Sequence, residues 1–169
     1  MKKKVLMISA AVLVLLVLGG LWYTRPRTWA EITGEDTDVL FASLTMADPD
    51  WDAETAAEKL GYKHWQIPQN DPKREEAGGA ILQTLELEHY TFRASLDSLI
   101  PRDGISMGWH DDLTIAMAWG EEEHGFFYFG NNGKVIFPSG WGYAIYHCDP
   151  ALFDELTAIV QTYGTLQKD

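Results

Sequence analysis

The chain has 169 residues, with 13 basic and 25 acidic side chains and a formal net charge of −12. Because an acidic chain repels nucleic acid, we predict no nucleic-acid partner. The single cysteine, Cys148, excludes an internal disulfide. Its position also excludes a lipoprotein, since that class needs a cysteine at the end of the apolar leader.

The first predicted element is a helix over the nineteen uncharged residues from Val5 to Tyr23. With a rise of about 1.5 Å per residue it reaches roughly 28 Å, close to the hydrocarbon thickness of a bilayer. Lys2, Lys3 and Lys4 precede it, and the positive-inside bias keeps that end in the cytoplasm. We therefore predict a single-pass membrane anchor with the C-terminal domain outside.

The residues that follow favour an uncleaved anchor over a cleaved signal peptide. The best pair of small residues for cleavage is followed at once by bulky side chains. Trp22 and Tyr23 are typical of the lipid headgroup level, and Arg25 and Arg27 just beyond them suit phosphate contact. We predict a membrane interface at these four residues, with a cleaved signal peptide as the alternative.

Residues 28–169 are predicted to form one acidic extracytoplasmic domain, and residues 1–27 the cytoplasmic tip, anchor and juxtamembrane exit. Five basic residues and no acidic ones lie before residue 28, so the rest carries 8 basic against 25 acidic side chains, a net −17. Its length suits a single domain with its own core. Such a charge attracts cations or basic partners, although it is also typical of a solvated surface that keeps a protein soluble.

Three Asp-Pro steps predict helix starts, because aspartate is a good N-cap and proline is tolerated at the first helical position. The helices predicted from these steps span residues 49–60, 72–88 and 150–163. The last has the clearest pattern, with one apolar stripe that must pack against another element. Its apolar positions are Leu152, Phe153, Leu156, Ile159, Val160 and Tyr163.

Alternating apolar residues predict the strands. We expect a short strand at Trp29–Ile32 and a longer one at Val39–Met46, with Leu40, Ala42, Leu44 and Met46 on one face. A meander of five antiparallel strands is predicted at 105–109, 113–119, 126–129, 135–137 and 143–147. With three helices, these strands predict a two-layer α+β domain after the transmembrane helix.

Two acidic clusters are candidate metal sites. Alternate residues from Asp48 to Asp52 have the spacing that opens a calcium loop, but Ala53 and Lys59 replace the glycine and glutamate that this loop requires. Capping of a helix start explains the aspartates better. The acidic run at 121–124 consists of consecutive loop residues, which seldom converge on one ion. We predict no metal and no cofactor.

Cys148 follows His147 and precedes an aspartate, which are the residue types of an activated thiol nucleophile. In the predicted meander the loops of His110 and Asn132 share one edge of the sheet with His147. His110 lies about 17 Å from His147, which disfavours a pair with Cys148, whereas contact between His147 and Asn132 is plausible. Cys148 also stands where an apolar residue can pack onto Phe153 at the start of the last helix. We favour a structural thiol and assign no catalytic residue.

Aromatic residues crowd the predicted sheet, and the run from Phe126 to Phe129 is aromatic on both faces of one strand. If helices cover one face, the other can present a surface to a sugar ring, a peptide or a protein. We favour a sheet that is covered on both faces, with the exposed aromatic surface as the alternative. The candidate binding surface comprises Trp119, Phe127, Phe129, Asn132, Trp141 and His147.

The predicted function is a membrane-anchored extracytoplasmic interaction or ligand-binding domain. Its partners are the membrane, through residues 5–23, and a protein or an envelope ligand. The alternative is a cell-envelope hydrolase that uses a carboxylate pair or His147 with Cys148. We favour the binding domain over an enzyme because no coherent catalytic set appears.

Overall fold

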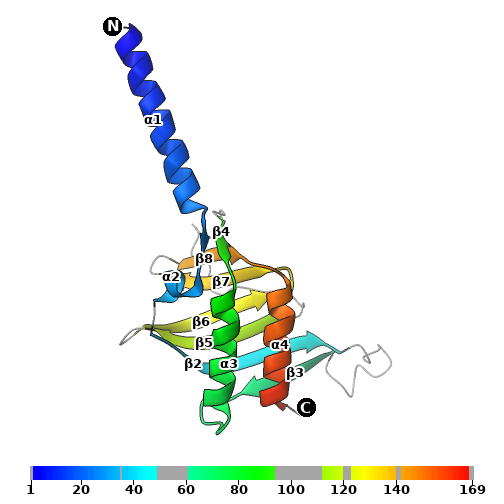
Figure 1. Cartoon of the computed structure of the whole chain (residues 1–169). Coiled ribbons are helices and arrows are strands. Elements are labelled where there is room, and N and C mark those ends of the chain that lie inside the picture. The colour runs from blue at the N-terminus through cyan, green and yellow to red at the C-terminus, as the bar shows by residue number, and fades with distance from the viewer. Residues whose placement is uncertain are drawn as a thin grey trace.

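The computed structural model describes residues 2–34, 36–48, 61–93, 112–119, 123–139 and 142–167. These residues form an α+β fold with four helices and one antiparallel sheet of nine strands (Figure 1). The helices are α1 (Lys2–Tyr23), α2 (Trp29–Thr33), α3 (Arg74–Leu87) and α4 (Ala151–Tyr163). The strands are β1 (Pro26–Arg27), β2 (Thr37–Ala47), β3 (Tyr62–Ile67), β4 (Tyr90–Phe92), β5 (Asp112–Trp119), β6 (Glu123–Gly130), β7 (Lys134–Ser139), β8 (Gly142–His147) and β9 (Thr165–Leu166).

The sheet order is β1-β4-β8-β7-β6-β5-β2-β3-β9. The predicted meander is confirmed over β5, β6, β7 and β8, which pair in sequence order. The other edge of β5 is occupied by β2. The predicted helix at 49–60, the predicted strand at 105–109 and residue His110 lie outside the described residues. The chain therefore enters the sheet at the β1 edge and ends at the β9 edge (Figure 1).

The hydrophobic core lies between the sheet and the helices α3 and α4, which cover one of its faces (Figure 1). Both helix predictions are confirmed, and the apolar stripe of each is buried. Burial of this apolar area is the main stabilising contribution. The sheet provides Leu44, Leu113, Ile115, Met117, Phe127 and Phe129, and the two helices provide Ile81, Leu85, Leu156 and Val160.

The predicted strand at Trp29–Ile32 is wrong, because these residues begin α2. The Thr28 hydroxyl accepts a hydrogen bond from the Glu31 N–H at 3.3 Å, and the Glu31 carboxylate accepts one from the Thr28 N–H at 3.0 Å. This reciprocal capping box satisfies two backbone donors at the helix start. It also positions Trp29, whose ring centroid lies 5.1 Å from that of Phe127 in the core. The T-x-x-E spacing was the signal that predicts it.

The strand predicted at Val39–Met46 is confirmed within β2, but its face assignment is wrong at one position. Val39 pairs with Met117 and Phe41 pairs with Ala116, so Leu40 is the extra residue of a β-bulge. Val39, Ala42 and Leu44 are buried in the core. Leu40 instead lines a cavity at the sheet surface. Strands β1, β3, β4 and β9 were not predicted, because each is short or lacks clear alternation.

The apolar helix predicted at the N-terminus is confirmed as α1, which projects away from the sheet (Figure 1). The side chains from Ile8 to Tyr23 are exposed. Among the residues that the structure describes, no helix has the length and apolar character that crossing a membrane requires. The membrane-spanning role of Val5–Tyr23 therefore stays a prediction.

Two glycines of α3 differ in what surrounds them. A Cβ at Gly78 would lie 3.3 Å from the Cβ of Val39, whereas a Cβ at Gly79 meets none of the described atoms within 4 Å. Gly78 therefore allows α3 to pack closely on β2, while Gly79 only lowers the helix propensity of α3.

We expect Gly79→Ala to raise the free energy of unfolding by up to about 1 kcal/mol, because alanine loses less backbone entropy in a helix. Gly78→Ala should gain less or be destabilising, because Val39 must move. Urea unfolding followed by circular dichroism measures both variants. An equal gain at both positions would contradict the close packing of α3 on β2.

Candidate functional site

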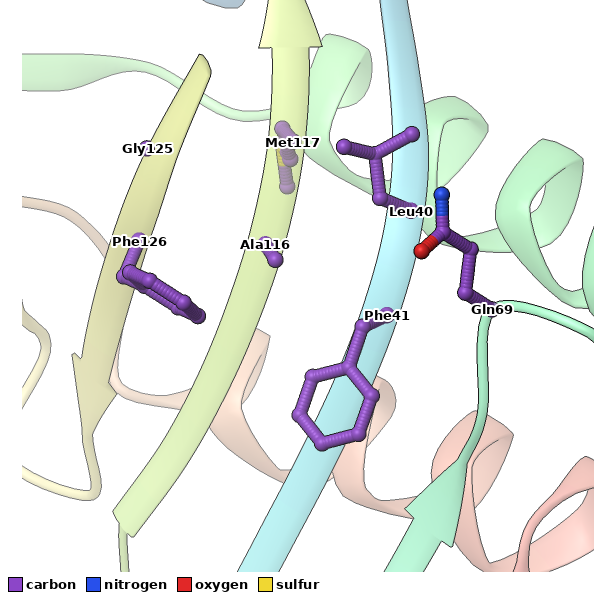
Figure 2. Close-up of a pocket in the computed structure, with 7 residues that line it drawn as sticks. All are labelled: Leu40, Phe41, Gln69, Ala116, Met117, Gly125 and Phe126. Atoms are coloured by element: carbon purple, nitrogen blue, oxygen red, sulfur yellow. The ribbon is translucent and has the colours of Figure 1, made fainter.

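A cavity of about 430 Å³ opens on the face of the sheet opposite α3 and α4 (Figure 2). Its lining comes from β2, β5, β6 and the turn after β3 (Figure 2). We call it the sheet groove. Its lining residues are Leu40, Phe41, Gln69, Ala116, Met117, Gly125 and Phe126.

Small residues form the hollow of the sheet groove and aromatic rings form its walls. Ala116 is paired with Phe41 on one side and with Phe126 on the other. Figure 2 shows these two rings on either side of the short Ala116 side chain. Gly125 and Met117, which pair with each other across β5 and β6, complete this part of the lining. The bulge in β2 adds Leu40 to the lining beside Phe41.

The lining of the sheet groove is mostly apolar and accessible. The Phe126 side chain is 53% exposed although it is a large hydrophobic residue. Gln69, which is exposed, contributes an amide to the lining. A concave apolar cavity of this volume with a few polar groups is the usual form of a small-molecule site.

Beside the sheet groove lies a set of polar side chains, which we call the His64 cluster. It consists of Ser43, Thr45, His64 and Gln66. Thr45 pairs with His64, and Ser43 pairs with Gln66, across β2 and β3. These pairs alternate with the core pairs Leu44–Trp65 and Ala42–Ile67, so the cluster shares the groove face of the sheet.

Hydrogen bonds organise the His64 cluster around the imidazole ring. The Gln66 amide nitrogen lies 2.6 Å from Nε2 of His64. Oγ1 of Thr45 lies 3.1 Å from Nδ1, on the other side of the ring. The Ser43 hydroxyl lies 3.5 Å from Nε2. These contacts on both ring nitrogens hold the imidazole in a defined orientation.

Of the predicted surface residues that the structure describes, Phe127 and Phe129 do not share a surface with Asn132 and His147. Phe127 and Phe129 are 0% and 2% exposed and face the core, so they offer no area to a partner. The exposed aromatic residue of β6 is Phe126, on the other face. The Trp119 side chain and residue Trp141 lie outside the described part. Sequence alternation showed that β6 has two aromatic faces but not which one is buried.

Asn132 and His147 both lie near the β6–β7 turn. The Asn132 side chain accepts a hydrogen bond from the Lys134 N–H at 3.1 Å and so stabilises that turn. His147 pairs with Lys134 on β7 and with Thr91 on β4. Partial burial, together with the charges of Arg93 and Lys134, lowers the pKa of His147. The imidazole is therefore neutral at pH 7.

Cys148 is partly buried against the core. Burial, with Glu88 and Asp149 nearby, raises the pKa of its thiol to about 12. The thiol lies 3.5 Å from the Gly133 carbonyl oxygen, to which it donates. A reactive cysteine needs a lowered pKa, so this environment favours the protonated, unreactive form.

We expect iodoacetamide to alkylate Cys148 of the folded chain at pH 8 at least about a hundredfold more slowly than in the urea-unfolded chain, because only the thiolate reacts. The folded rate should keep rising with pH well above 9, as the raised pKa requires. Mass spectrometry of quenched samples gives both rates. Equal rates in the two states at pH 8 would contradict the raised pKa.

The residues predicted at the membrane interface connect α1 to the sheet. The Arg25 guanidinium forms an ion pair with Glu31 at 2.6 Å and lies 4.8 Å from the Trp22 ring centroid. The Tyr23 ring lies 4.7 Å from the Phe92 ring, and the Arg27 guanidinium lies 5.9 Å from the Tyr23 ring. Because β1 pairs with β4, the predicted exit is part of the sheet and not a separate linker.

Of the aspartates considered for calcium, Asp48 forms an ion pair with Lys63 at 2.9 Å. Asp50 and Asp52, and the side chains of the acidic run at 121–124, lie outside the described part. Within the part described, no group of three His, Cys, Asp or Glu residues is arranged to hold a metal ion. No family model, no curated protein and no solved structure matches the chain. The geometry is therefore the basis for a functional proposal.

Proposed function

We propose that the protein is a membrane-tethered, extracytoplasmic ligand-binding domain that holds an apolar group in the sheet groove. The observation that carries the proposal is the exposed Phe126 ring facing Phe41 across Ala116. Large exposed apolar side chains around a cavity usually mark a binding site, because water contact with them is unfavourable. The cavity volume of about 430 Å³ suits a small ligand.

The tether is proposed from the sequence and from the position of α1. The stretch from Val5 to Tyr23 is uncharged and follows three lysines. The exposed apolar side chains of Ile8 to Tyr23 project away from the sheet, and a bilayer would bury them. The acidic residues all lie beyond residue 28, on the part assigned to the outside.

The hydrolase alternative has less support. One form of it uses a carboxylate pair. The other requires His147 to activate Cys148, but the raised pKa of Cys148 keeps the thiol protonated. His147 lies within β8 and is paired through its backbone with two neighbouring strands. We therefore assign the thiol a structural role at the end of β8.

Binding of 1-octanol to the full chain, held in an amphipathic polymer, tests the groove. Ligand-observed saturation-transfer NMR gives the affinity. We expect Ala116→Trp to fill the cavity and weaken binding by at least about tenfold, the equivalent of 1.4 kcal/mol. Leu87→Trp, at a residue 76% exposed on α3, is the matched control and should bind as the unmodified chain does. Equal binding by the Ala116→Trp variant would overturn the proposal for the groove.

Protease shaving of intact cells tests the tether. We expect residues beyond 28 to be digested from outside while the N-terminal lysines stay protected. Full protection of the acidic domain in intact cells, with digestion after lysis, would show that it lies inside. Release of the intact domain into the medium would instead indicate a cleaved signal peptide.

A further inference from the structure

The sheet groove and the His64 cluster adjoin on one face of the sheet. Phe41 of the groove and Ser43 of the cluster are two residues apart on β2 and point to the same face. At about 3.3 Å per residue their positions are separated by roughly 7 Å. A single small molecule can therefore contact both. The apolar and polar parts of this face are next to each other and do not overlap.

The chemistry of the His64 cluster indicates what it can bind. Each hydroxyl can form up to three hydrogen bonds, so the contacts of Ser43 and Thr45 with His64 leave them further capacity. The Gln66 carboxamide has an acceptor oxygen in addition to the nitrogen that contacts His64. The cluster contains no lysine, arginine, aspartate or glutamate. Its two hydroxyls and its carboxamide therefore offer neutral donors and acceptors.

The charge of the domain restricts the ligand further. Residues 28–169 carry a net charge of −17, so the surrounding field disfavours an anionic ligand. A cationic ligand would be attracted, but the cluster contains no carboxylate to pair with it. A neutral head with several hydroxyl groups matches the neutral donors and acceptors.

We propose that the ligand is a neutral amphiphile, with its apolar chain in the sheet groove and a hydroxylated head bound by Ser43, Thr45, His64 and Gln66. The inference rests on the proposed function of the groove and adds the class of ligand. In this arrangement the groove gives the apolar part of the affinity and the cluster discriminates between heads. Glycosides and glycerol derivatives with an alkyl chain have this composition.

The test uses three probes with the same eight-carbon chain: octyl β-glucoside below its micellar concentration, octanoate and 1-octanol. They are titrated at pH 8 against the full chain in amphipathic polymer by saturation-transfer NMR. The same titrations of the Ala116→Trp variant, whose groove is filled, measure the background signal from binding outside the groove. We expect the glucoside to bind at least about tenfold more tightly than octanoate, because its head is uncharged and can form several hydrogen bonds.

Variants of the cluster separate its role from that of the groove. Ser43→Ala combined with Gln66→Leu should weaken glucoside binding by about tenfold and leave 1-octanol binding within about twofold. If the double variant does not fold, glucoside binding is measured with Ser43→Ala alone, which removes one hydroxyl. Thr162→Ala removes an exposed hydroxyl on α4 and is the matched control.

Each outcome decides one of the two proposals. If Ala116→Trp does not weaken the binding of 1-octanol, or if 1-octanol does not bind at all, the proposal that the groove is a binding site is overturned. Normal 1-octanol binding with octanoate equal to or tighter than the glucoside would overturn the neutral head. Normal glucoside binding by the cluster variants would also overturn it, because the head would then be held elsewhere.

Discussion

Phe127→Ala is expected to lower the free energy of unfolding by about 3–5 kcal/mol, because it leaves a cavity in the core in addition to losing apolar burial. Phe127 is 0% exposed, and its ring lies 5.1 Å from Trp29 and 4.9 Å from Phe137. The cavity would lie between α2 and β7, where several rings support one another. Urea unfolding of the full chain in mild detergent, followed by tryptophan fluorescence, measures the loss.

Phe126→Ala is the matched control, since it removes the same ring from the neighbouring position on β6. Phe126 is 53% exposed, so we expect a change within about 1 kcal/mol, together with weaker binding of 1-octanol. The two variants thus separate the core face of β6 from its groove face. The assignment of the faces would be wrong if Phe126→Ala were the more destabilising of the two.

Gly133→Ala is expected to lower the free energy of unfolding by about 3 kcal/mol. Gly133 has φ of +74°, a conformation that costs an L-residue about 1–2 kcal/mol. An alanine Cβ would also lie 2.5 Å from the carbonyl oxygen of Cys148, so the connection from β8 to α4 must shift. Gly133 and Cys148 also share a backbone hydrogen bond of 2.9 Å, from the Cys148 N–H to the Gly133 carbonyl.

Gly34→Ala serves as the control for the conformational part of this effect. Gly34 has φ of +90°, and a Cβ there meets none of the described atoms within 4 Å. We expect a loss of only about 1–2 kcal/mol, from the backbone conformation alone. Both variants are compared by urea unfolding with circular dichroism. Equal losses would show that the contact between Gly133 and Cys148 does not limit the turn.

Local patterns in the sequence predicted the elements that depend on residues near one another in the sequence. The apolar stripe of α4 and the alternation of β5 to β8 both follow from a period that repeats over neighbouring residues. The capping box at Thr28 is equally local. The predicted strand is wrong there because the short stretch from Trp29 to Ile32 contains the Glu31 that completes this capping box. β3 was missed because Tyr62 to Ile67 mixes polar and apolar residues on both faces.

The candidate site could not be predicted in the same way. The sheet groove depends on β2 lying beside β5, a pairing between residues more than 70 positions apart such as Phe41 and Ala116. It also depends on a bulge that moves Leu40 out of the core alternation. The His64 cluster depends on the register of β2 against β3. Register and strand neighbours are long-range properties, which period-two alternation does not specify.

The sequence by itself determined an apolar N-terminal helix, an acidic α+β domain and the buried stripes of α3 and α4. Each of these depends on the spacing and the charge of residues that are close along the chain. Only the tertiary structure decided which face of β6 is covered. Phe126 and Phe127 are chemically identical, and alternation assigns them to opposite faces without naming the buried one. Phe127 is buried in the core, where its ring packs against those of Trp29 and Phe137, whereas Phe126 stays exposed on the other face and lines the groove.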